Sequence, residues 1–143
     1  MTDGRTILTI TAHSAQALLA AAAEAADKAG VPMCIAVSDV GGNLVGFLRM
    51  DGAPLLSIDI ATNKAYTAVG FGMPTHSWHD FIKDDAPLAL GIVHTPRLVT
   101  FGGGYPIRSE GAVIGGIGIS GGHYHQDMEV ATAALTKLGY PVD

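Results

Sequence analysis

The sequence predicts an α+β fold in which a central antiparallel sheet is covered by helices. The predicted strands come mostly in adjacent pairs joined by short turns, which is typical of hairpins rather than of parallel βαβ units. The stretches between these pairs have the composition or the apolar spacing of helices. Elements mixed in this order favour helices packed over an antiparallel sheet.

The first part of the chain predicts a strand, a helix and a hairpin. Residues 6–10 ("TILTI") form a short, alternating, β-branched run, which predicts an edge strand. The alanine-rich residues 12–29 favour a long helix, and Gly30 is expected to end it in the C′ position. Residues 33–50 contain two apolar runs around the turn-forming residues 39–43, and they predict the clearest hairpin of the chain.

Two helices are expected next. Residues 53–72 carry apolar side chains at helical spacing, with Pro54 in the first turn and Gly70 or Gly72 at the end. A shorter helix follows Pro74, with Thr75 as its N-cap residue.

The last part of the chain predicts a second hairpin and a final helix. Residues 86–96 are ambiguous, with a helical turn as one interpretation, whereas residues 97–101 ("RLVTF") predict a strand that residues 102–104 interrupt. Residues 105–120 predict the hairpin and residues 125–139 the helix.

Composition limits the function classes. The 143 residues suit one domain, residues 1–143, with 48% hydrophobic and 15% charged residues. A net charge of −5 with only 8 Lys and Arg lacks the basic face that nucleic acids require. No apolar run is long enough to span a membrane, the N-terminus does not resemble a signal peptide, and Cys34 is the single cysteine. We therefore expect a cytoplasmic protein without nucleic-acid or membrane partners, and the apolar, charge-poor composition predicts a homo-oligomer.

The stretch "GIGISGGHYHQD" has the outline of a dinucleotide-binding loop, Gly116-x-Gly118-x-x-Gly121. That fold requires a second parallel strand after the helix and an acidic residue about 20 positions on. Only 22 residues follow Gly121, so a dinucleotide site is not expected. The glycines are better explained by a strand that lies close beneath a helix.

Histidines are the most suggestive polar residues. His76 and His79 are three residues apart on a predicted helix and could chelate a metal ion, and His123 and His125 stand at a helix start near Asp127. Ordinary surface histidines are the alternative, since no fixed zinc-binding spacing is present.

The few charged residues beside apolar segments also require a reason. Arg49, Lys64 and Arg97 could hold an organic carboxylate, because arginine offers a bidentate contact and lysine a point charge. The alternative is an ion pair within the chain, such as Asp51 with Lys64 or with Arg97.

Several motifs together resemble the GlcG/HbpS family over about residues 5–138. They are "SDVGGN", "RMDGA", "NKAYTA", "FGGGYP" and "GGIGISGG". The resemblance implies a profilin-like sandwich that assembles into dimers or oligomers up to octamers, and it implies a haem or corrinoid-type ligand. The ligand-binding residues that match the family cluster are Arg49, Asp51, Lys64, Arg97, Gly102, Gly103, Gly104 and Asp127.

The resemblance and the histidines lead to two hypotheses. The first is a small-molecule-binding protein that takes haem or a related tetrapyrrole, with His13, His123 or His125 as the iron ligand. His13 would act across a subunit interface. The second is an isomerase, lyase or hydrolase of a small carboxylated or aromatic metabolite. In that enzyme His76, His79, His123 and His125 are candidate catalytic residues, either as ligands of a divalent metal ion or as acid–base groups.

Overall fold

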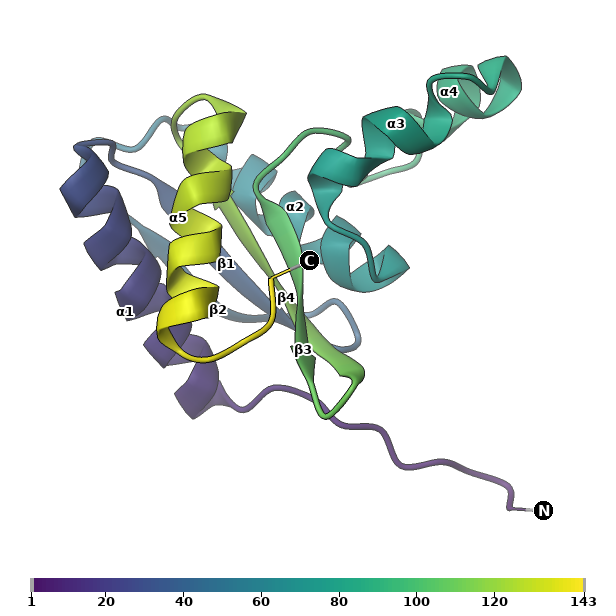
Figure 1. The fold of residues 1–143 in the computed structure, drawn as a ribbon, viewed down its shortest axis with the longest axis horizontal. Helices are drawn as coiled ribbons and strands as arrows, with labels where there is room; N and C mark the ends of the chain where they lie inside the picture. Colours follow the sequence, from purple (N-terminus) through teal and green to yellow (C-terminus); the bar gives the residue numbers. More distant parts are fainter. Residues whose placement is uncertain (1, 143) are drawn as a thin grey trace.

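The structure, a computed structural model, describes residues 2–142, so the first and last residues of the expected domain lie outside it. Figure 1 shows an antiparallel sheet between two layers of helix. The elements are α1 (Ala12–Ala29), β1 (Cys34–Asp39), β2 (Leu44–Arg49), α2 (Ser57–Phe71), the 3₁₀ turn η1 (Thr75–Ser77), α3 (Trp78–Ile82), α4 (Ala86–Ile92), β3 (Gly104–Ser109), β4 (Ala112–Ser120) and α5 (Tyr124–Lys137). The predicted α+β class is confirmed.

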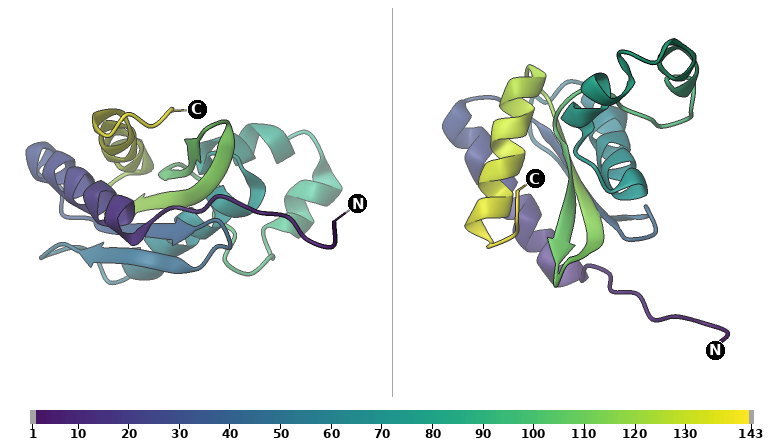
Figure 2. Two further views of the ribbon diagram at one scale, coloured as in Figure 1. Left: turned by 90° about the horizontal axis from the view of Figure 1, so that it is seen from below. Right: turned by 45° about the vertical axis from the view of Figure 1, so that its right-hand side comes forward.

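The four strands form one sheet in the order β2-β1-β4-β3, and all neighbouring strands are antiparallel. Helices α1 and α5 cover one face and α2 covers the other (Figure 2). Both predicted hairpins are confirmed. The first strand of one hairpin, β1, pairs with the second strand of the other, β4, in the centre of the sheet. Each central strand is therefore covered on both sides.

The two faces of the central strands carry side chains of different size. Ile35, Val37, Ile117 and Ile119 point into the main core under α1 and α5. The opposite face carries small residues, so α2 lies close to the sheet. A Cβ atom added at Gly118 would come within 2.6 Å of the backbone nitrogen of Ala65 in α2. The glycines of the "GIGISGG" stretch thus serve helix–strand packing, as predicted, and not a nucleotide.

Helix α1 begins and ends where the sequence indicates. The side chain of Thr11 accepts a hydrogen bond from the backbone N–H of Ser14 at 3.1 Å. Gly30 ends the helix with φ 71°, a left-handed conformation that glycine adopts without steric cost.

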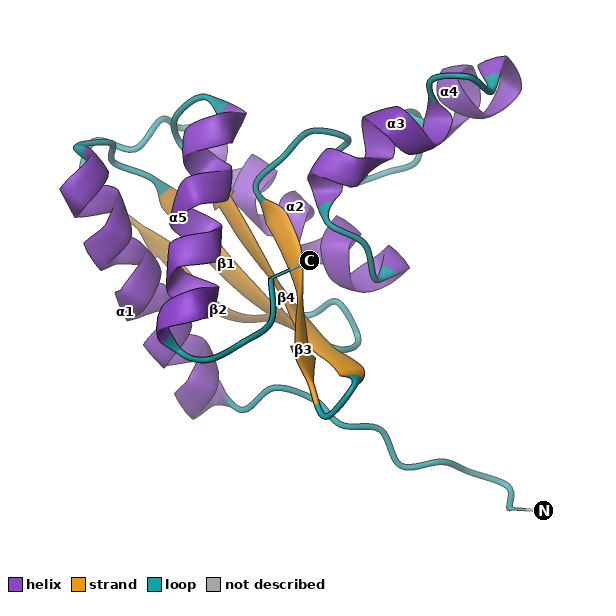
Figure 3. Cartoon of the chain, viewed as in Figure 1, coloured by secondary structure: helices purple, strands orange, loops and turns teal. Residues whose placement is uncertain are grey.

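Two predicted strands are wrong, and Figure 3 draws both segments as loop. Residues 6–10 form one backbone hydrogen bond with the sheet, in which Ile10 N donates to Ile114 O at 2.9 Å. From Gly115 onward β1 already occupies that edge of β4, so the earlier residues have no strand to pair with. Residues 97–101 are held by a side chain instead: the hydroxyl of Thr67 donates to Arg97 O and accepts from Val99 N, each at 3.0 Å.

Two helix starts differ from the prediction, and a further helix lies in a segment that the sequence left ambiguous. Pro54 precedes α2, which begins at Ser57. Thr75 does not cap a helix, because its hydroxyl accepts from the backbone N–H of Gly104 at 2.9 Å and so fixes η1 to β3. The ambiguous residues 86–96 contain α4, which Asp85 caps. Of the two expected end positions of α2, Gly72 is the one that the helix uses.

Helices α3 and α4 extend as an arm from the body of the protein (Figure 1). No helix within residues 2–142 combines the length and the apolar character needed to cross a bilayer.

Candidate functional site

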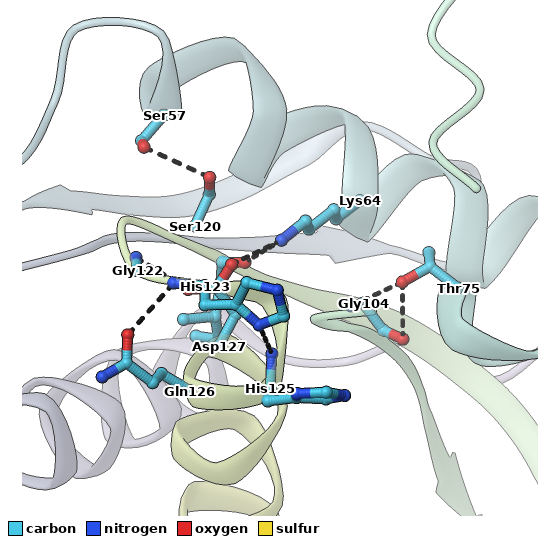
Figure 4. Close-up of polar contacts among 11 residues, drawn as sticks. Ser57, Lys64, Thr75, Gly104, Ser120, Gly122, His123, His125, Gln126 and Asp127 are labelled. Carbon is cyan, nitrogen blue, oxygen red and sulfur yellow. Dashed lines mark hydrogen bonds and ion pairs between the residues drawn. The ribbon is translucent and has the colours of Figure 1, made fainter. Parts of the chain in front are cut away.

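A buried ion pair joins the two helix layers beyond the C-terminal end of β4. Lys64 of α2 lies 2.8 Å from the carboxylate of Asp127 in α5, and the two residues are 0% and 2% exposed. The lysine ammonium also donates to Ile119 O at 2.8 Å, and the second carboxylate oxygen accepts from Gly122 N at 3.1 Å (Figure 4). Burial lowers the pKa of Lys64 and raises that of Asp127, while the attraction between them opposes both shifts. The pair fixes the turn between β4 and α5.

Glycines enclose this pair. A Cβ atom at Gly103 would come within 2.6 Å of the Lys64 ammonium, and one at Gly104 within 2.6 Å of the Lys64 carbonyl oxygen. Gly103 has φ 123°, which only glycine adopts readily. Gly103 therefore lies directly against the ion pair, Gly104 packs on the backbone of Lys64, and Gly102 borders an open surface hollow.

That hollow lies where η1, α3 and the start of α5 approach the loop before β3. It has a volume of about 310 Å³. Its lining residues are His76, His79, Asp80, Thr100, Phe101, Gly102 and Tyr124. The structure thus brings two predicted catalytic histidines to one opening, directly in front of the ion pair; we call it the Gly102 hollow.

His76 has the most distinctive environment in this hollow. It is half-buried, its ring centroid lies 5.6 Å from that of Tyr105, and its Nδ1 has no hydrogen-bond partner among the described residues. Burial lowers the pKa of His76, so the imidazole is neutral at pH 7. Its Nε2 is the nitrogen left for a ligand. His79, by contrast, is exposed, with Nδ1 3.9 Å from Asp80.

The depressed pKa of His76 predicts a pH dependence of stability. Below about pH 6.5 the unfolded chain binds a proton at this residue while the folded chain resists it. The free energy of unfolding should therefore fall as pH falls through this window. Urea unfolding at pH 7.5 and 5.5 measures the effect, and His76→Asn should reduce the difference between the two values. An unchanged difference in His76→Asn, or an equally reduced difference in the exposed control His94→Asn, would contradict this account.

His123 and His125 have different tasks. His123 is the N-cap residue of α5: its Nδ1 accepts from the backbone N–H of His125 at 3.3 Å, and its own N–H donates to Gln126 Oε1 at 3.0 Å. A neutral ring that accepts at Nδ1 carries its proton on Nε2, and that nitrogen is then not free to bind a metal. His125 is exposed and its ring has no capping role. The rings of His123, Tyr124 and His125 contact one another at tilted or edge-on angles, with centroids 4.1 to 4.8 Å apart.

His13 lies far from this group. It belongs to the first turn of α1, which starts at the end of the molecule opposite to the start of α5 (Figure 1). Within one chain His13 therefore cannot share a ligand with His125. Only a second chain could bring the two histidines together.

The predicted metal site is not assembled within the described part of the chain. Among residues 2–142 no group of three or more His, Cys, Asp or Glu side chains is placed to hold a metal ion. The geometry of the four histidines gives the divalent-metal alternative no support.

The remaining predicted ligand-binding residues lie in two other places. Arg49 donates to Ala53 O at 2.9 and 3.2 Å and lines, with Asp51, a hollow beside the end of α1. Arg97 donates to Asn63 Oδ1 at 3.0 Å. The expected ion pair of Asp51 with Lys64 is wrong, because Lys64 is buried with Asp127 instead.

Comparison with known proteins decides the family. The family model described as "Haem degrading protein HbpS-like" matches residues 10–136. The chain belongs to this family. The expected GlcG/HbpS relationship is therefore confirmed, and the solved structures below have the same fold.

Relatives of this HbpS-like chain include both short and long proteins. A 15.0 kDa protein from the dhaT–dhaS intergenic region of Citrobacter freundii is 40% identical over 136 residues, 94% of this chain and 96% of that protein. The corrinoid adenosyltransferase PduO of Salmonella typhimurium is 38% identical over 127 residues, which cover 88% of this chain but only 38% of PduO. The crystal structure of a PduOC–haem complex has a TM-score of 0.86 and 35% identity, and covers 94% of this chain and 98% of that one.

Proposed function

We propose that this chain binds haem at the Gly102 hollow, with a histidine as the iron ligand. The observation that carries the proposal is the neutral imidazole of His76 at this opening, with Nε2 as the nitrogen left to meet a ligand. The haem complex of the similar PduOC structure supports the choice of ligand.

The residues of the hollow fit an iron porphyrin. Neutral histidine is a common axial ligand of haem iron, which when bound would supply redox chemistry. Phe101 and Tyr124, 43% and 39% exposed, offer ring surfaces that would be covered by a flat apolar macrocycle. The residues given for the lining include no lysine or arginine. The nearby Lys64 is fully buried.

The candidate ligands differ in what ligation would cost. His76 and His125 can present Nε2 without loss of a hydrogen bond, whereas His123 would have to give up its helix cap. Loss of a cap costs about 1 kcal/mol. His13 would have to come from a second chain. We therefore place His76 first and His125 second, followed by His123 and His13.

A homo-oligomer is part of the proposal. A volume of about 310 Å³ is at the lower end for ligand pockets and would enclose only part of a tetrapyrrole. The α3–α4 arm exposes Phe81, Leu90 and Val93, which are 51%, 73% and 47% exposed. A second chain placed against this arm would cover apolar surface that water otherwise contacts. A cytoplasmic location is likewise proposed.

The experiment is a haem titration of tag-free protein, followed in the Soret region, for the wild type and for single alanine variants of His13, His76, His79, His123 and His125. We expect a saturable band in the wild type and a weakened, shifted band in His76→Ala. The matched control is His94→Ala, because His94 is equally a surface histidine but does not line the hollow. Wild-type behaviour of all five variants would contradict histidine ligation.

A second candidate function rests on the same imidazole. A neutral, half-buried histidine beside an opening is also suited to act as a general base on a small carboxylated or aromatic metabolite. A substrate screen at pH 6–8 tests this function. If activity appears, it should be lost in His76→Ala and retained in His94→Ala.

A further inference from the structure

We infer a second ligand site, separate from the Gly102 hollow, that takes a small aromatic carboxylate. It is an apolar hollow between the C-terminal half of α2 and the segment after α4. Its volume is about 390 Å³, within the range of small-molecule pockets. The lining residues are Val40, Gly41, Gly42, Tyr66, Thr67, Val69, Gly70, Phe71, Trp78, Ile92, Thr95, Pro96 and Leu98.

One wall of this second hollow is aromatic. The rings of Phe71 and Trp78 have centroids 4.9 Å apart, and Phe81 lies 5.8 Å from each of them. Phe71 lines the hollow yet is 55% exposed. A flat apolar body placed against this wall would remove that surface from water and add ring–ring contacts.

The rim of the second hollow holds a cation in a strained position. Arg97 is not glycine but has φ 68°, a left-handed conformation that is strained for a residue with a side chain and that occurs preferentially at functional sites. Its carbonyl oxygen is held by the hydroxyl of Thr67 at 3.0 Å. Arg97 does not itself line the hollow, but its neighbours Pro96 and Leu98 do, and its guanidinium lies over the ring of the lining residue Tyr66.

The side chain of Arg97 is fixed as well as its backbone. The guanidinium carbon lies 3.7 Å from the ring centroid of Tyr66, and Nε donates to Asn63 Oδ1 at 3.0 Å. Neither Nη group has a hydrogen-bond acceptor within residues 2–142. A guanidinium held by its Nε side and by its face presents the two Nη groups as a fork, and this fork matches a carboxylate.

These features together specify the ligand. The carboxylate is recognised by the Arg97 fork, and one or two aromatic rings occupy the apolar hollow. The chain carries a net charge of −5 and so disfavours anions in general. A fixed cation at an apolar opening therefore marks a place where an anion can bind selectively. The inference is independent of haem, because no histidine lines this hollow.

The test is isothermal titration calorimetry of the tag-free protein with 2-naphthoate and with its neutral analogue 2-naphthamide. Trp78, the only tryptophan, gives a second readout by fluorescence. We expect saturable binding of one naphthoate per chain and at least roughly tenfold weaker binding of the amide, since the amide gives up the charge-assisted hydrogen bonds to the fork. Arg97→Gln should bind naphthoate as weakly as the wild type binds the amide, Arg97→Lys should be intermediate, and the control Lys28→Gln, on α1 across the sheet, should match the wild type.

Three results would overturn the inference: no saturable naphthoate binding, equal affinities for acid and amide, or an Arg97→Gln variant with wild-type affinity and an intact circular dichroism spectrum. Displacement of naphthoate by one equivalent of haem would also overturn it, since the two sites would then not be separate. Failure of haem binding alone leaves these outcomes unaffected.

Discussion

Replacing Lys64 with methionine is expected to lower the free energy of unfolding by about 3–5 kcal/mol, because it leaves the Asp127 carboxylate buried without its cation. Asp127 is 2% exposed, and its remaining polar contacts are the backbone N–H groups of Gly122, at 3.1 Å, and of Gly121. Water cannot replace the ammonium group there, since Gly103 and Gly104 close over the site. Urea unfolding followed by circular dichroism measures the loss.

Two comparisons isolate the burial of this pair. The double variant Lys64→Met with Asp127→Leu should be less destabilised than the sum of its single variants, because no charge then remains buried alone. Lys83→Met removes a lysine that is 3.0 Å from Asp80 on the surface, and it should leave stability nearly unchanged. If Lys64→Met lowers the free energy of unfolding no more than Lys83→Met does, the buried pair does not stabilise the fold as proposed.

Gly118→Ala is expected to destabilise the protein by about 3 kcal/mol or more and to lower Tm by roughly 10 °C. The added Cβ would clash with the carbonyl oxygen of Ala61 and lie 2.6 Å from the backbone nitrogen of Ala65. The backbone of β4 and that of α2 would therefore have to move apart. Neither β4, which pairs on both edges, nor α2 can yield without loss of packing. Differential scanning calorimetry gives both quantities.

Gly70→Ala is the matched control. Gly70 also lies in α2, but a Cβ atom there meets nothing within 4 Å. Because alanine is the better helix former, this variant should be neutral or gain about 0.5–1 kcal/mol. Similar destabilisation by both substitutions would contradict the close packing of α2 on β4.

Much of the fold follows from local sequence signals. The alanine-rich run with Gly30 behind it and the turn-forming residues 39–43 carry local signals that predict their elements correctly. The strands expected at 6–10 and 97–101 are wrong because β-branched composition does not reveal which strand a segment can pair with. From Gly115 onward β1 already occupies the edge of β4 that Ile10 reaches, whereas residues 97–101 are held by the hydroxyl of Thr67.

The site was less accessible to sequence reasoning. Charge alone suggested Asp51 as a partner of Lys64, whereas the true partner, Asp127, is 63 residues away and meets it only through the fold. The capping role of His123 had a local signal, because Gln126 stands three residues on, as in a capping box. The apolar hollow beside Arg97 had none, since its walls come from four separate segments.

The central claim is haem binding at the Gly102 hollow, and a haem titration of wild-type protein beside His76→Ala tests it most directly. We predict a sharp Soret band that saturates at a fixed ratio of haem to chain in the wild type, with weaker binding and a shifted band in the variant. A featureless titration of the wild type, with broad absorbance that rises without saturation, would contradict the claim.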